Sequence, residues 1–245
     1  MDSVIAPEQI KIKFDMVRVD GGYFTLRTQN DKRPHRFLST YVHQFHIGKY
    51  PVTVELWNSV MGEPVNSAVR NIGLPVTRVN FYDAVEFCNK LSVLTGLRPC
   101  YTGIQNKRIT WNKKSNGFRL PTVYEWIYAA TGGNRTKGYI YSGSNTPFEV
   151  GWYYENSRNV PHPVGRLKPN ELGIYDMSGN VEEWCWDYRS SEKKDLHKEK
   201  RVFRERAICG GSYEGSAQSM AIREYHYFYA LYKYSNIGLR VVRTK

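Results

Sequence analysis

The sequence lacks the features of several protein classes. Its 4 Cys residues are widely spaced, with no C-x-x-C pair and no His at metal-ligand spacing, which argues against a zinc site. No apolar run approaches the about 20 residues that cross a bilayer, and no signal-peptide pattern precedes Asp2. No internal repeat and no Pro- or Ser-rich linker divides the chain. We expect four buried thiols, or one disulfide and two thiols, among Cys88, Cys100, Cys185 and Cys209.

The composition is that of a basic globular protein. Of the 245 residues, 41% are hydrophobic and 24% are charged, and the formal net charge is +12. The positive charge is not gathered on one helix and no nucleic-acid motif accompanies it, so it predicts a solvated basic surface and no nucleic-acid partner. The alternative is a nucleic-acid binder that uses the positive charge. The aromatic fraction of 14%, with 19 Tyr, is high.

Local patterns predict a few strands and three helices. Residues 16–19 and 21–26 alternate around a Gly-Gly pair, which predicts a hairpin, and residues 45–49 read as a further strand. Helices are expected after Thr53, after Asn80 as far as Gly96, and after Thr122, whose partner Glu125 completes a capping box for 123–130.

Two stretches show neither the alternation of a strand nor the apolar spacing of a helix. Residues 133–175 are rich in Gly, Asn, Pro and Tyr, which predicts a long loop region. The run from Arg189 to Arg206 is the most polar part of the chain and is interpreted as a solvent-exposed insertion, with an electrostatic partner contact as the alternative.

The segment between Tyr213 and Ser235 carries the strongest functional signal. It combines aromatic residues with small Gly215, Ser216 and Ser219, the composition of an antibody combining site. Tyrosine supplies a large amphipathic surface at low entropic cost, whereas an active site would show convergent acids, bases or thiols. We expect most of these rings to be exposed. The alternative is a strand whose alternate Tyr residues face the core. The predicted ligand-binding residues are Tyr213, Gly215, Ser216, Ser219, Tyr225, His226, Tyr227, Phe228, Tyr229, Tyr232 and Tyr234.

Several motifs, in order, resemble the formylglycine-generating-enzyme (sulfatase-modifying-factor) family. They include Arg119-Leu120-Pro121-Thr122 with Glu125-Trp126, the block from Gly173 to Trp184, Gly210 to Tyr213, and Asn236 to Arg240. The resemblance covers roughly residues 14–243. It implies an α+β fold: a single C-type-lectin-like domain of small antiparallel sheets, two or three helices and many loops. We therefore expect an extension over 1–13 and this domain over 14–245.

The resemblance also locates where catalysis would occur. Catalytic members hold copper with two thiols shortly after the Gly-Gly-Ser-Tyr block, and soft thiolates suit copper(I). By count from Tyr213, Gly215 and Met220 stand at these positions, so no enzyme and no catalytic cofactor are expected. The alternative is a metal- or thiol-dependent oxidoreductase in which Cys209 or Met220 takes another role, although Cys209 is better explained as a small buried residue.

The framework motifs on both sides of an aromatic interior further resemble the variable proteins of diversity-generating retroelements, as found in Treponema. The resemblance implies a variable region over about 210–240, cell-surface display, and a membrane link only through a lipid anchor missing from this chain. Most interior residues are reachable from AAC or AAT by adenine changes, while Glu214, Gln218, Met220 and Glu224 are not. The expected partner is a protein or other macromolecule, bound by a monomer.

The block ending in Trp184 contains a second candidate site. In calcium-binding members the positions of Asp176, Gly179, Val181 and Glu183 supply oxygen ligands, so the resemblance implies a structural Ca²⁺ at these residues. The alternative is that Asp176 and Asn180 cap turns while Trp184 anchors the core.

Overall fold

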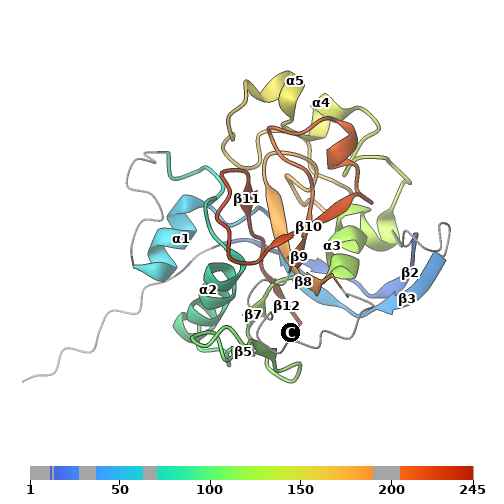
Figure 1. Ribbon diagram of the computed structural model, residues 1–245. Helices are drawn as coiled ribbons and strands as arrows, with labels where there is room; N and C mark the ends of the chain where they lie inside the picture. The colour runs from blue at the N-terminus through green and yellow to red at the C-terminus, as the bar shows by residue number, and fades with distance from the viewer. Residues whose placement is uncertain (1–11, 13, 28–36, 63–70, 190–204, 245) are drawn as a thin grey trace, which may run out of the picture.

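The computed structural model describes residue 12 and residues 14–27, 37–62, 71–189 and 205–244 (Figure 1). The described chain forms three longer helices, several short ones and two four-stranded sheets. The helices are α1 (Val54–Met61), α2 (Phe81–Leu94), α3 (Val123–Ala130), α4 (Pro147–Val150), α5 (Tyr154–Ser157) and the 3-10 turns Gly133–Arg135 and Gln218–Met220. The strands are β1 (Met16–Val19), β2 (Gly22–Arg27), β3 (Phe37–Val42), β4 (Phe45–Gly48), β5 (Tyr101–Thr102), β6 (Thr110–Trp111), β7 (Phe118–Arg119), β8 (Glu182–Tyr188), β9 (Glu205–Cys209), β10 (Tyr225–Tyr229), β11 (Ile237–Gly238) and β12 (Val242–Arg243).

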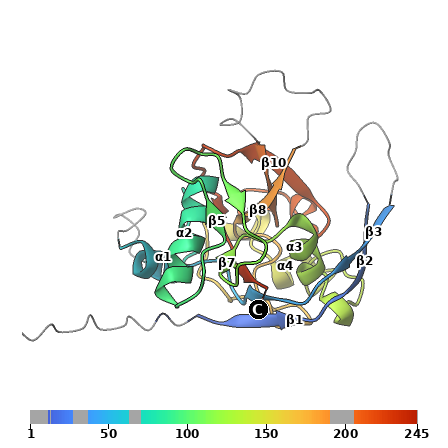
Figure 2. The ribbon, with the colours of Figure 1, turned by 90° about the horizontal axis from the view of Figure 1, so that it is seen from below.

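One sheet joins the two ends of the described chain. Its order is β1-β4-β12-β7, and every pair in it is antiparallel. Ile47 of β4 faces both Val17 of β1 and Val242 of β12. The strand nearest the C-terminus therefore lies inside the sheet, and β1 runs along the base of the molecule (Figure 2).

The second sheet carries the aromatic segment. Its order is β10-β9-β8-β11, in which β10, β9 and β8 are antiparallel neighbours and β11 runs parallel to β8. β10 is the edge strand, with Tyr225 opposite Cys209 and Phe228 opposite Arg206. The tyrosine-rich strand β10 therefore pairs with β9 along one edge, and its other edge has no neighbouring strand in this sheet.

The predicted N-terminal hairpin is wrong. β1 pairs with β4, whereas β2 pairs with β3 in a separate two-stranded ribbon that extends away from the main sheets (Figure 1). The Gly21-Gly22 pair does not form the expected turn between paired strands. A Cβ on Gly22 would collide with Tyr128 and Asn134, so glycine is required for close packing against α3 and the loop after it.

The three longer helices begin at the residues predicted from the sequence. Thr53, Asn80 and Thr122 each accept a hydrogen bond from the backbone of the first turn. Capping boxes with Asp83 and Glu125 fix α2 and α3. These are local interactions, which is why the sequence alone located them.

The second sheet separates two hydrophobic cores, because alternate residues of β8 and β9 point to opposite faces. On one face Trp184 and Ile208 pack with α2. On the other face Cys185, Ala207 and Cys209 pack with α3. Within the described residues no helix is long and apolar enough to span a membrane.

The region 133–175 is largely irregular, as predicted, apart from α4, α5 and one 3-10 turn. Most of the polar run from Arg189 to Arg206 lies outside the described residues. At its start Arg189 forms an ion pair with Glu205 at 3.2 Å. The expected extension over 1–13 also lies outside them, except for Ile12.

Candidate recognition surface

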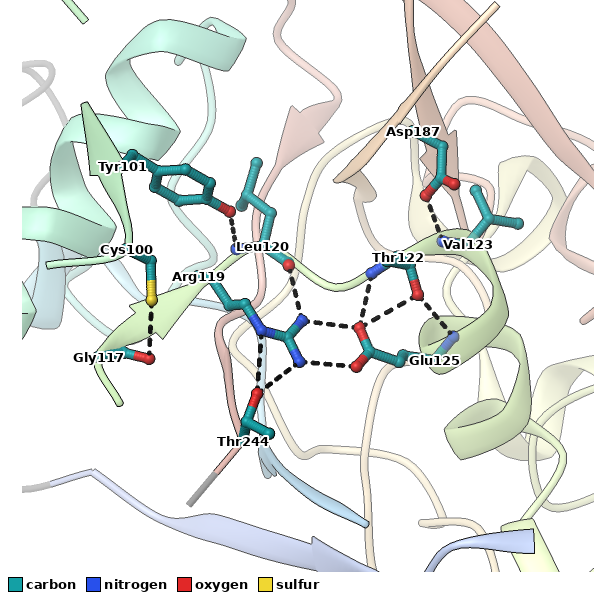
Figure 3. Close-up of polar contacts among 10 residues, drawn as sticks. All are labelled: Cys100, Tyr101, Gly117, Arg119, Leu120, Thr122, Val123, Glu125, Asp187 and Thr244. Atoms are coloured by element: carbon teal, nitrogen blue, oxygen red, sulfur yellow. Dashed lines mark hydrogen bonds and ion pairs between the residues drawn. The ribbon is translucent and has the colours of Figure 1, made fainter. Parts of the chain in front are cut away.

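The Arg-Leu-Pro-Thr motif is part of the framework (Figure 3). The guanidinium of Arg119 donates two hydrogen bonds of 2.7 Å to the Glu125 carboxylate and two further ones to the Thr244 hydroxyl. Glu125 also accepts from the backbone N–H of Thr122, and Val123 donates its N–H to Asp187. This network connects β7, α3, β8 and the C-terminal strand, so the motif fixes tertiary structure.

A buried ion pair links two other motifs. Arg240 and Glu183 are both fully buried, and Arg240 Nη2 lies 2.8 Å from Glu183 Oε1. Trp126 Nε1 donates to Glu183 Oε2 at 2.7 Å. Arg240 also donates to the carbonyls of Gly48 and Tyr175. Every buried charge here has partners, as such a site requires.

The residues proposed for calcium do not fit that ion. Both oxygens of Glu183 accept hydrogen bonds from Arg240, whose positive charge occupies the place that a cation would take. Asp176 Oδ2 accepts from Gly165 N–H at 2.7 Å, and burial raises the pKa of Asp176 to about 6. Among the residues that the structure describes, no three His, Cys, Asp or Glu side chains gather as a metal site.

The alternative interpretation of that block explains its polar residues. Asp176 and Asn180 both adopt positive φ, at 56° and 64°. Asn180 accepts from the His162 N–H and donates to the His162 carbonyl, which ties two loops together. Trp184 is fully buried and donates to the Val79 carbonyl. The block therefore organises loops around a core tryptophan.

The positions that would hold catalytic thiols have a structural role. Met220 is fully buried, and its atoms lie where a Cβ on Gly151 or Gly211 would be placed. Gly215 is half-buried and accepts a hydrogen bond from Tyr154 N–H through its carbonyl. Neither residue presents a thiolate, and the Met220 thioether is enclosed by the surrounding loops.

Two neighbouring thiols lie in the protein core, away from these positions. Cys185 Sγ and Cys209 Sγ are 3.6 Å apart on β8 and β9, and both residues are buried in the α3-side core. Burial raises the pKa of both thiols. Raised pKa and loss of solvent contact are properties of inert structural cysteines.

The first part of the aromatic segment differs from the prediction. Tyr213 is only 5% exposed, its N–H donates to Asn180 O, and its carbonyl accepts from the Ser157 hydroxyl. Tyr213 is therefore a framework residue, because its backbone and ring are used to close the loop. Ser216 is exposed and Ser219 half-buried, and Ser219 Oγ donates to the Ser216 carbonyl.

Two rings of β10 cover the α3-side core. Tyr225 and Tyr227 are half-buried, with centroids 5.8 Å apart in an edge-to-face arrangement. The Arg189 guanidinium lies 5.2 Å from the Tyr227 ring centroid. Burial raises the pKa of both phenols. For Tyr225 and Tyr227, the alternative prediction of a strand whose alternate Tyr residues face the core is therefore correct.

The remaining rings form one connected surface. Phe228, Tyr234, Tyr232 and Tyr229 are joined edge to face, with successive centroids 5.0, 6.1 and 5.6 Å apart. Tyr229 is 45% and Tyr232 51% exposed, while Phe228 and Tyr234 are half-buried and pack against the α2-side core. We call these four residues the aromatic surface. His226 is exposed beside it on β10.

The aromatic surface is held by the first turn of α2 and the loop before it. Phe81 N–H donates to Ala230 O and Arg78 N–H donates to Tyr234 O. Lys233 forms an ion pair with Asp83 at 2.8 Å. Sequence reasoning missed these supports because they are about 150 positions from the rings that they hold, and no local pattern signals them.

A buried carboxyl lies under the adjoining loop. Glu182 is 8% exposed, and its Oε2 accepts from Asn236 Nδ2, which also contacts Ser212 Oγ. Burial and the nearby Glu214 carboxylate raise the pKa of Glu182 to about 7.

A cavity of about 450 Å³, lined by Tyr50, Val52 and Leu56 among others, shares no residue with the predicted binding positions.

Comparison with known proteins agrees with this framework. The sulfatase-modifying factor enzyme 1-like domain family matches residues 3–245. This chain belongs to that family. Formylglycine-generating enzymes are related at lower coverage: that of Streptomyces coelicolor is 32% identical over 115 residues, 39% of this chain and 37% of the enzyme. The buried networks of Arg119 and Arg240 lie within the motifs that predicted the family.

Three of the similar proteins match nearly the whole chain. The chaperone protein LppX of Paenibacillus barcinonensis is 39% identical over 262 residues, covering 94% of this chain and 90% of the relative. The structure of Treponema denticola variable protein 1 aligns with a TM-score of 0.80 at 30% identity, covering 95% of each chain. That of CarF aligns with a TM-score of 0.75 at 27% identity. The fold is thus the C-type-lectin-like α+β fold that the family resemblance implied.

Proposed function

We propose that this family member recognises a protein or other macromolecule through the aromatic surface and catalyses no reaction. The observation that carries the proposal is the connected set of four rings, two of them about half exposed, on a backbone fixed by α2. Central tyrosines of an interface contribute roughly 2 kcal/mol or more each, and a pre-fastened backbone lowers the ordering cost of binding.

Two findings support the absence of catalysis. Gly215 and the buried Met220 stand where catalytic relatives are expected to carry thiols. Two of the relatives that match nearly the whole chain are named a chaperone and a variable protein. The proposal includes cell-surface display and diversification of residues in the 210–240 region, both supported by likeness to the variable protein. Tyr213 is excluded from the diversified set because it is buried.

A matched pair of double variants tests the aromatic surface. Tyr229→Ser with Tyr232→Ser removes two exposed rings in edge-to-face contact. The control, Tyr23→Ser with Tyr41→Ser, removes another such pair from the β2–β3 ribbon. Envelope proteins captured by the immobilised wild type and quantified by mass spectrometry should be lost with the first variant and kept with the control. Equal capture by both variants, or equal loss, contradicts the proposal.

A second candidate is chaperone-type binding of non-native proteins, favoured by the 39% identical relative named a chaperone. Exposed apolar rings suit unfolded segments of many sequences. Light scattering by reduced insulin B chain gives the test. A chaperone should suppress aggregation, and the Tyr229→Ser, Tyr232→Ser variant should lose this effect. A dedicated receptor should capture a native partner and leave insulin aggregation unchanged.

A further inference from the structure

A second surface feature lies apart from the aromatic surface. No Asp or Glu occurs between Glu86 and Glu125. Within this stretch, Arg98, Lys107, Arg108, Lys113 and Lys114 are all exposed, on or next to the β5–β6 hairpin. We call residues 98–114 the basic hairpin. Its charges account for five of the 35 Lys and Arg residues of the chain, gathered in a single supersecondary unit.

These five cations are free of ion pairs within the part of the chain that the structure describes. The other two cations of the acid-free stretch do have partners: Lys90 pairs with Glu86 at 3.4 Å and Arg119 with Glu125 at 2.7 Å. Lys107 and Lys113 instead lie over aromatic rings, Tyr82 and Trp111. The basic hairpin therefore has positive charge that no neighbouring carboxylate neutralises.

The backbone holds these charges on one ridge. Arg98 N–H donates to Asn116 Oδ1, and Arg98 Nη2 donates to the Lys114 carbonyl, which brings Arg98 beside the β6 end of the hairpin. At the opposite end, Arg108 N–H donates to Gly103 O and closes the turn. The ridge lies beside α2 in both views (Figures 1 and 2).

Apolar side chains are exposed near Arg98, at the end of α2 opposite to Tyr82 and Lys107. Val93 is 64% and Leu94 45% exposed in the last turn of α2. Leu97 N–H donates to the Ser92 carbonyl, so the chain turns back at the end of α2. This turn brings Arg98 close to the last turn of the helix. Aliphatic side chains beside unpaired cations form the combination that binds at a lipid headgroup boundary.

We propose that the basic hairpin and the last turn of α2 bind a membrane surface that contains anionic phospholipid. Lys and Arg would contact lipid phosphates, while Val93 and Leu94 would enter the boundary between headgroups and acyl chains. An anionic bilayer is favoured over nucleic acid because a nucleic acid offers nothing to the two aliphatic side chains. The only aromatic ring on the β6 strand, Trp111, lies under Arg119 and Lys113 and is not free for base stacking.

Vesicle co-sedimentation with two matched triple variants tests this proposal. Arg98→Glu, Lys113→Glu and Lys114→Glu reverse three hairpin charges. The control, Lys137→Glu, Arg158→Glu and Arg166→Glu, makes the same net charge change at exposed residues that also have no ion pair in the described chain. Circular dichroism verifies that both variants fold. The vesicles contain phosphatidylcholine, alone or mixed with phosphatidylglycerol.

The wild type and the control should bind the mixed vesicles and not phosphatidylcholine alone, with affinity falling as salt rises. The hairpin variant should bind at least about a hundredfold more weakly, because three attractive charges become repulsive. Val93→Ser with Leu94→Ser should weaken the binding that persists at high salt. Equal weakening by both triple variants, equal binding to neutral vesicles, or complete displacement by an equal phosphate concentration of duplex DNA would overturn the proposal. None of these outcomes bears on the aromatic surface.

Discussion

Glu183 accepts hydrogen bonds from Arg240 and Trp126 in a site closed to solvent. Replacing Glu183 therefore tests how much this buried network contributes to the free energy of unfolding. Glu183→Gln leaves the Arg240 charge buried without a counter-ion, so we expect a loss of about 3–5 kcal/mol in unfolding free energy. Urea denaturation followed by tryptophan fluorescence measures it. Glu86→Gln is the control, because its ion pair with Lys90 joins two solvent-exposed side chains and should contribute under about 1 kcal/mol.

Glu182 provides a pH-dependent prediction. Its pKa is about 7 in the folded protein, above the usual value of 4.5, so the folded state binds an extra proton between these values. The contribution of Glu182 to the free energy of unfolding is therefore fully present at low pH and is lost as the pH rises toward and through 7. Glu182→Gln should be about 3 kcal/mol more stable than wild type at pH 8 and nearly unchanged at pH 4. Equal effects at both pH values would contradict the assigned pKa.

The four cysteines are expected to be unreactive in the folded protein. All four are buried, and burial raises the thiol pKa at each position. Iodoacetamide should label none of them within a time that labels all four in urea. Intact mass counts the adducts. Rapid native labelling of Cys209 would instead revive the thiol-dependent alternative.

At the scale of elements, the cap of α3 can be tested alone. The Thr122 hydroxyl accepts from Glu125 N–H, and its own N–H donates to the Glu125 carboxylate. Thr122→Ala should cost about 1–2 kcal/mol, because one helix donor loses its partner. Thr122→Ser keeps the hydroxyl and should recover most of this stability in thermal unfolding. A Ser variant as unstable as the Ala variant would show that the Thr methyl group, not the cap, matters.

The elements also show what local sequence can predict. The starts of α1, α2 and α3 follow from Thr53, Asn80 and Thr122, because a cap involves only the next three residues. The pairing of β1 with β4 was missed, since β1 and β2 alternate equally well whether or not they pair with each other. Strand order depends on contacts between distant segments, and one sequence contains no direct record of them.

The candidate site was predicted in part for the same reason. The concentration of tyrosine located β10 and the loop after it, but composition did not distinguish Tyr213, which is buried, from Tyr232, which is half exposed. Nor could Glu183 be recognised as the partner of Arg240, because 57 positions separate the two residues. A carboxylate in a calcium-like motif and one in a buried ion pair look identical in sequence.

At the scale of the whole molecule, β12 connects the parts of the first sheet. It lies between β4 and β7, and Arg119 donates to Thr244 immediately after it. Removing residues 241–245 should expose the edges of both neighbours and abolish cooperative unfolding, as measured by circular dichroism on heating. Removing Lys245 alone is the control and should leave the transition intact. A cooperative transition in the longer truncation would show that β12 is dispensable.

The position of β12 also sets an order of events during synthesis. Ile47 is translated long before Val242, its neighbour in the sheet. A ribosome must therefore release almost the entire polypeptide before β4 meets its second hydrogen-bonding partner. Until then the nascent chain has an unfinished sheet edge, which other chains could pair with, so cells producing this protein would benefit from factors that shield emerging polypeptides.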